Sequence, residues 1–189
     1  MTDRKKEIIA TAADLFRRKG YTAVSMRTLA EEIGIRAASL YNHIDSKQEI
    51  LDHIIHRVAD RFTAGMAEVR QLDGPPTEKI RRIILLHVEI TLDDPAGMES
   101  LQNNWMYLEG DSLAAYKASR NAYEAHLRQI VRDGIAAGEI RDVNPELLIY
   151  SMLATLRYLY IWYPRQQGID PDKLRAEMIE VILRGVTIR

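Results

Sequence analysis

Residues 36–43 carry a cluster of small and polar side chains. The side chains expected to point outward from this segment are those of Arg36, Ala37, Ser39, Tyr41, Asn42 and His43. An arginine fork can pair with guanine and an asparagine amide with adenine, and each such pair is worth about 1–3 kcal/mol of discrimination against a wrong base. No acidic residue lies between Gly34 and Ile44, so nothing in this segment would repel a phosphate backbone.

A helix-turn-helix would position this cluster for contact. Ser25 can cap a helix, and Gly34 can end it by supplying a left-handed residue. The apolar residues between them fall on one helical face: Met26, Leu29, Ala30 and Ile33. A short helix from about Arg36 to His43 follows, so two helices meet at a glycine over about residues 25–44. Such a second helix fits the major groove of B-DNA, which is about 12 Å wide.

A wider motif around these helices resembles the signature of a known family. Gly34 and the run Leu40-Tyr41-x-His43-Ile44-x-Ser46-Lys47-x-x-Ile50-Leu51 are similar to the pattern of the tetracycline-repressor family, with Ile44 where the family usually has an aromatic residue. The resemblance implies a three-helix DNA-binding domain at the N-terminus. It also implies a larger helical domain that binds a ligand and forms a dimer.

The resemblance also implies a role for each residue of the motif. Tyr41, His43 and Lys47 correspond to phosphate contacts, and Thr28 to the polar residue that seats the first helix of the motif on the DNA backbone. The candidates for base readout are Arg27, Arg36, Ala37, Ser39 and Asn42. Taken singly, Tyr41 could instead be a packing residue and Lys47 a solvated charge, so the assignment depends on the combination and its spacing.

Helical periodicity continues through almost the whole chain, which predicts an all-α protein of about nine helices. We expect residues 1–47 to form the DNA-binding domain and residues 48–189 the ligand-binding and dimerisation domain. A helix over 46–72 connects them, with a capping box made by Ser46 and Glu49 at its start. Further helices are expected over 77–92, 96–108, 113–137, 144–163 and 170–186, the first of them capped by Thr77.

The last two predicted helices carry enough apolar surface for a subunit interface. Residues 147–162 are apolar on nearly every face. The final helix adds a stripe of Leu174, Met178, Val181, Ile182 and Val186. Two such helices from each subunit could form the four-helix interface that is usual in the family, which we favour over the alternative that both are simply core. A two-fold dimer would place two recognition helices about 34–36 Å apart or a multiple of that distance.

Aromatic and basic residues of the second domain are candidates to bind an effector: Trp105, Arg120, Tyr123, Tyr158 and Trp162. The stretch Tyr116-x-x-x-Arg120-x-x-Tyr123-Glu124 and the later Trp162-Tyr163-Pro164 resemble the regulatory domain of family members that respond to acyl-CoA thioesters. That resemblance implies that Arg120 meets a phosphate or a pantetheine carbonyl. The alternatives are an uncharged hydrophobic or drug-like effector, or aromatics that only fill the core.

These patterns together predict a dimeric transcriptional repressor that a small hydrophobic effector releases from operator DNA. The net charge of −1 does not oppose DNA binding, because the segment through Leu51 carries +2 and the remainder −3. A helical enzyme and an adaptor that binds only protein are the least favoured alternatives.

The composition argues against other classes. The absence of cysteine excludes a disulfide framework, a thiolate metal site and a cysteine nucleophile. One group of residues has a spacing that a metal could use: Asp52, His53, His56 and Asp60. On a long connecting helix, however, we expect such histidines to be exposed to solvent or part of the core. We therefore predict neither a metal nor a cofactor. No apolar run reaches the 18–20 residues of a membrane span and the first residues do not resemble a signal peptide, so a cytoplasmic location is expected.

Overall fold

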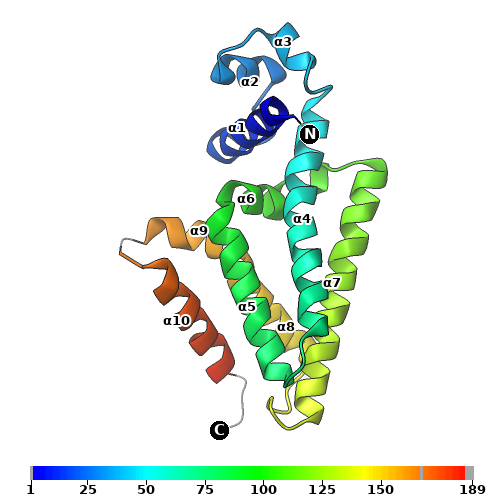
Figure 1. Ribbon diagram of the computed structural model, residues 1–189, viewed down its shortest axis with the longest axis vertical. Helices are drawn as coiled ribbons and strands as arrows, with labels where there is room; N and C mark the ends of the chain where they lie inside the picture. The colour runs from blue at the N-terminus through cyan, green and yellow to red at the C-terminus, as the bar shows by residue number, and fades with distance from the viewer. Residues whose placement is uncertain (1, 167, 186–189) are drawn as a thin grey trace. The chain divides into compact units, whose positions relative to one another are not determined.

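Helices dominate the computed structural model, which describes residues 2–166 and 168–185 (Figure 1). The α-helices are α1 (Asp3–Lys19), α2 (Met26–Ile33), α3 (Ala37–Tyr41), α4 (Lys47–Gln71), α5 (Pro76–Asp93), α6 (Pro95–Asn103), α7 (Gly110–Ala136), α8 (Pro145–Arg157), α9 (Leu159–Trp162) and α10 (Pro171–Arg184), and two 3₁₀ turns are η1 (Trp105–Tyr107) and η2 (Tyr163–Arg165). The predicted all-α class is confirmed. Within the described ranges no helix is both long and apolar enough to cross a bilayer.

The chain divides into two compact units. The first unit comprises Met1–Ala59 and Asp94–Lys117, and the second comprises Asp60–Asp93 and Ala118–Arg189. The long helices α4 and α7 therefore contribute residues to both units. This grouping differs from the predicted boundary after residue 47, because the first unit also takes in the N-terminal half of α4 together with α6 and η1. The predicted division into a DNA-binding and a ligand-binding domain concerns function and stays a prediction.

The core of the first unit forms around α1. The buried side chains of this helix are Ile8, Ile9, Ala12, Ala13, Leu15 and Phe16. The ring of Phe16 meets the edge of the Tyr21 ring with centroids 5.0 Å apart. Because α1 packs against both α2 and α6, its apolar face supports the helix-turn-helix.

The turn between α2 and α3 follows the sequence prediction closely. Ser25 Oγ accepts a hydrogen bond from the Thr28 N–H at 3.1 Å and so caps α2. Gly34 ends the helix with φ +77°, a left-handed conformation that costs a glycine little. Its N–H donates to Glu31 O at 3.2 Å, and the Ile35 N–H donates to Ala30 O at 3.0 Å. This pair of bonds is a Schellman motif, which satisfies the last carbonyls of α2.

The start of α4 forms the predicted capping box in a shifted form. Ser46 Oγ accepts from the Glu49 N–H at 3.0 Å. Glu49 Oε2 reaches back to the Asp45 N–H at 2.7 Å, one residue before the serine. The other oxygen of Glu49 accepts from Lys5 Nζ at 2.5 Å, so the same carboxylate also ties α1 to α4.

Three predicted helix boundaries were wrong. Thr77 does not cap α5, which begins at Pro76; the Thr77 N–H and hydroxyl donate to Glu139 Oε2 at 3.0 and 2.8 Å. The helix predicted over 96–108 is α6 and η1, separated at Asn104. The helix predicted over 144–163 breaks at Tyr158 (φ −92°, ψ 1°) into α8 and α9. Val186, the last residue of the predicted stripe, lies outside the described residues.

In the second unit, α4 and α5 come unusually close at one point. A Cβ atom placed on Gly65 would lie 2.5 Å from the methyl carbons of Leu86, which is 7% exposed. A larger residue at position 65 would therefore require the end of the Leu86 side chain to move.

Candidate nucleic-acid interface

The surface of α3 has the character predicted for a DNA-reading helix. Leu40 and Ile44 are buried and anchor the helix to the first unit. The exposed residues of the segment include Arg36, Tyr41, Asn42 and His43, and Tyr41 keeps 51% of its surface accessible. Ala37 and Ser39 are half-buried. The helix therefore directs its polar residues outward and its apolar residues inward, as a base-reading helix requires.

The two candidates on α2 differ in how freely they could reach DNA. Arg27 is exposed and pairs with Glu31, with Arg27 Nε and Glu31 Oε1 3.0 Å apart. Such an exposed pair stabilises little and is readily exchanged for another partner. Thr28 is half-buried, and its hydroxyl lies 2.9 Å from Ser25 Oγ. Thr28 thus contributes to the N-terminal cap of α2.

Lys47 has a structural role that the sequence did not predict. Its ammonium donates to the backbone carbonyls of Tyr21 at 3.1 Å and Val24 at 2.9 Å, and it lies 4.3 Å from the centre of the Tyr21 ring. Partial burial lowers the pKa of Lys47. These two carbonyls use two of the three ammonium hydrogens, which leaves one for a phosphate. Backbone carbonyls have no signature in the sequence, so this contact could be found only in the structure.

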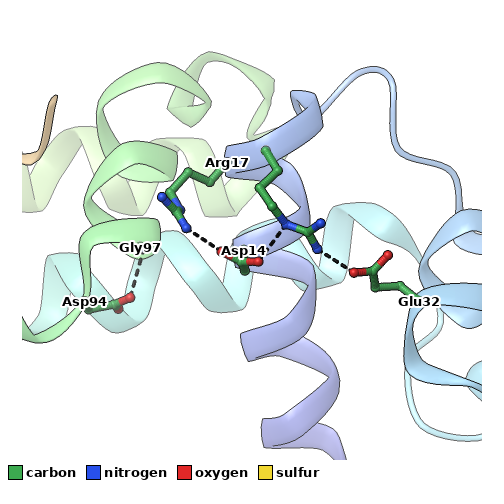
Figure 2. Close-up of polar contacts among 6 residues, drawn as sticks. Asp14, Arg17, Glu32, Asp94 and Gly97 are labelled. Atoms are coloured by element: carbon green, nitrogen blue, oxygen red, sulfur yellow. Dashed lines mark hydrogen bonds and ion pairs between the residues drawn. The ribbon is translucent and has the colours of Figure 1, made fainter. Parts of the chain in front are cut away.

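A network of ion pairs links α1 to α2 (Figure 2). Asp14 accepts from Arg17 at 2.7 Å and from Arg18 at 2.8 Å, and Arg18 also donates to Glu32 of α2 at 2.5 Å. The hydrogen bond from Arg17 is the main cause of the lowered pKa of Asp14. The same view shows Asp94 capping α6 through the Gly97 N–H at 2.9 Å.

The candidate effector residues are divided between the two units. Trp105 belongs to the first unit, where its ring lies 5.8 Å from that of Tyr116. Arg120 is half-buried, and Tyr158 and Trp162 are exposed on the second unit. Tyr123 is 8% exposed. Their shared role in effector binding stays a prediction.

A groove of about 130 Å³ lies between α4 and α7 in the second unit. Its lining residues are Thr63, Met66, Ala67, Arg70, Ser119, Ala122, Tyr123 and His126. Tyr123 also bonds inward, with its hydroxyl 3.0 Å from His87 Nε2. The sequence analysis missed His87, because a histidine within an apolar helix gives no signal of its own.

The histidines weighed as metal ligands contact other groups. His53 Nε2 lies 3.5 Å from Glu49 Oε1, and His56 Nε2 lies 2.9 Å from Ser112 Oγ. Across residues 2–166 and 168–185 no three His, Cys, Asp or Glu side chains come together as a metal site.

Two family models match the chain. Residues 8–54 match "Bacterial regulatory proteins, tetR family", and residues 73–186 match "Tetracyclin repressor-like, C-terminal domain". The chain belongs to the tetR family. The first match covers the helix-turn-helix, and the second covers most of α5–α10. A member of the tetR family is a transcriptional regulator and not an enzyme, in agreement with the sequence analysis.

Individual members of the tetR family are similar over nearly the whole chain. The HTH-type transcriptional repressor KstR2 of Mycobacterium tuberculosis is 22% identical over 189 residues, which cover 99% of this chain and 94% of KstR2. The structure of that regulator superposes with a TM-score of 0.93 at 20% identity, covering 100% of this chain and 97% of that one. The regulator PfmR of Thermus thermophilus is 27% identical with a TM-score of 0.81, covering 94% of this chain and 97% of PfmR.

A further solved structure contains both a small-molecule ligand and DNA. AibR, solved in complex with isovaleryl coenzyme A and operator DNA, has a TM-score of 0.82 at 23% identity, and the match covers 95% of this chain and 97% of AibR. At this level of identity the likeness concerns the fold.

Replacement of Lys47 by Met should lower the free energy of unfolding by about 1–3 kcal/mol, because the carbonyls of Tyr21 and Val24 lose a charged donor. Urea denaturation followed by circular dichroism measures this. Lys19→Met removes an exposed lysine of the same unit and should change stability by less than about 0.5 kcal/mol. Equal effects of the two substitutions would show that the loop does not depend on Lys47.

Proposed function

We propose that this protein represses transcription by binding operator DNA through α3 and that a small-molecule effector releases it. The observation that carries the proposal is the outward polar face of α3 on a buried apolar anchor, within a chain of the tetR family. Chromosomal DNA is the target, so we propose that the protein acts in the cytoplasm.

The proposed contacts fall into two groups. Tyr41, His43 and Lys47 would bind phosphates and fix the docking position, with Thr28 beside them. Arg27, Arg36, Ala37, Ser39 and Asn42 would contact bases. The exposure of Arg36, Tyr41, Asn42 and His43 supports contact with DNA, since exposed polar groups can exchange water for DNA at little cost.

Substitutions in the two groups should act differently. Tyr41→Ala should weaken binding to all DNA sequences by about tenfold, as loss of a phosphate contact does. Asn42→Ala or Arg36→Ala should in addition relax the preference for particular base pairs by about 1–3 kcal/mol each. Selection of bound sequences from a random DNA pool, repeated with each variant, measures both effects.

Two controls make this experiment decisive. Arg81→Ala, at an exposed position of α5 in the second unit, should leave DNA affinity unchanged. Affinity for the selected operator should fall steeply with salt, because each phosphate contact releases counterions. Salt-independent binding, or an unaltered base preference after Arg36→Ala and Asn42→Ala, would contradict the proposed interface.

We propose that α8 and α10 form the dimer interface. Several large apolar residues between the start of α8 and the end of α10 are exposed in the single chain: Leu147, Tyr150, Tyr158, Trp162 and Val181. The sequence analysis weighed a core role for these helices, but Tyr150 is 72% and Val181 70% exposed. Exposed apolar residues concentrated on consecutive elements are typical of a protein–protein contact.

Tyr150→Glu should convert the dimer to a monomer, because it places a charge in an apolar interface while leaving the fold of each chain intact. Sedimentation velocity gives the mass, and circular dichroism checks the fold. Ala115→Glu adds the same charge at an exposed position of α7 in the first unit and should leave the mass unchanged. A monomeric wild-type protein, or a Tyr150→Glu variant that stays dimeric, would contradict this interface.

For the effector we propose an acyl-CoA thioester, with an uncharged hydrophobic compound as the alternative. The isovaleryl coenzyme A complex of AibR supports the thioester, and the apolar lining of the α4–α7 groove is compatible with either compound. Calorimetry with short, long and aromatic acyl-CoAs should show binding of at least one of them and release of DNA at the same concentrations. Failure of every chain length to bind would contradict the thioester and favour the alternative.

The effector would act by shifting populations. It must bind the form whose recognition helices are wrongly spaced for DNA more tightly than the competent form, since a ligand with equal affinity for both shifts nothing. Helix α4 contributes to both units and begins at Lys47, so we propose that it transmits the change.

A further inference from the structure

Two polar side chains lie one turn apart on the buried face of α5. His87 is 3% and Thr91 2% exposed, and both belong to the second unit. Residues four apart on a helix face the same way, so the two side chains share one environment. The other buried residues of α5 are mostly aliphatic, which makes a polar pair at this depth unusual.

His87 is a neutral side chain held among aromatic rings. Burial lowers its pKa to about 3, helped by the charge of Arg157, so the imidazole is uncharged at neutral pH. Burial also raises the pKa of Tyr123, whose hydroxyl therefore keeps its proton. The ring of Phe62 lies 4.6 Å from the imidazole and 5.8 Å from the Tyr123 ring.

The bond between His87 and Tyr123 determines which proton the imidazole keeps. A neutral imidazole nitrogen is a much better acceptor than a phenol oxygen, so the Tyr123 hydroxyl donates to Nε2 across the 3.0 Å between them. The neutral ring then carries its hydrogen on Nδ1. His87 Nδ1 and the Thr91 hydroxyl have no hydrogen-bond partner within residues 2–166 and 168–185. Two donors on one buried face thus lack an acceptor.

Buried donors without partners destabilise a protein, so a fold that retains two of them on one face suggests that something else binds there. We propose that His87 and Thr91 bind an uncharged acceptor oxygen of the effector, a carbonyl on an otherwise apolar body. This inference rests on the proposed effector response and names the group that is recognised.

The surroundings favour a carbonyl over a carboxylate. The imidazole is neutral, and Arg157 already pairs with Glu124, with Arg157 Nη2 and Glu124 Oε1 2.7 Å apart. A buried carboxylate would therefore lack a compensating charge, whereas a ketone, ester or thioester oxygen needs only the two donors. Tyr123 contacts His87 and also lines the α4–α7 groove, so it connects the polar pair to a hollow that is open to solvent.

The stability of the ligand-free protein provides the first test. Thr91→Val keeps the shape of the side chain and removes the unpaired hydroxyl, so the Tm should rise by about 2–4 °C. Thr91→Ser keeps the hydroxyl and removes a methyl group, so the Tm should fall. A lower Tm for Thr91→Val would show that the hydroxyl is already satisfied, for example by a buried water, and would overturn the proposal.

Binding of a matched pair of small probes provides the second test. Cyclohexanone and methylenecyclohexane have nearly the same shape, but only the ketone has an acceptor oxygen. Titration followed by NMR should show wild type binding the ketone about fivefold more tightly, as one or two neutral hydrogen bonds predict. Thr91→Val and His87→Met should abolish this preference; the methionine thioether can weakly accept from Tyr123 but has no hydrogen to donate.

The outcomes separate this inference from the proposed effector class. Ketone preference in wild type that survives both substitutions, or no preference at all, overturns the role of His87 and Thr91. If the ketone preference follows the predicted pattern while acyl-CoAs fail to bind, the polar pair is supported and the thioester is excluded.

Discussion

The DNA-binding surface depends on an ammonium group at the start of α4. Lys47 bonds the carbonyls of Tyr21 and Val24, so the loop between α1 and α2 is attached to the helix that leaves the first unit. Helix α3 has five residues and could not be stable by itself. Its place is determined by the burial of Leu40 and Ile44 and by the loop that carries α2. One lysine thus contributes both to the shape of the interface and, as we propose, to its affinity for phosphate.

Polar groups serve two different purposes in this protein. On the surface of the first unit, Arg18 pairs with both Asp14 and Glu32 and so links α1 to α2. In the core of the second unit the donors of His87 and Thr91 lack partners within the described residues. Polar side chains that have partners stabilise a single arrangement of the helices. A buried donor without a partner instead destabilises the ligand-free protein and can be stabilised by a ligand that supplies an acceptor.

Local signals made much of the fold predictable, while long-range contacts did not. The cap at Ser25 and the end of α2 at Gly34 follow from rules that involve a few neighbouring residues, and both predictions are confirmed. Thr77 was misassigned because its partner, Glu139, is 62 residues away. The break at Tyr158 was missed because apolar periodicity continues through it. The exposed face of α3 followed from the pattern, but the contacts of Lys47 and His87 depend on tertiary packing.

Gly65 of α4 leaves room for the side chain of Leu86 of α5. Because the methyl carbons of Leu86 would lie 2.5 Å from a Cβ atom at position 65, a larger residue there would require the leucine side chain to move. A larger residue at position 65 would therefore alter the contact between α4 and α5 in the second unit. Since α4 also contributes residues to the first unit, a change at this contact would act on the helix that we propose transmits the effector response.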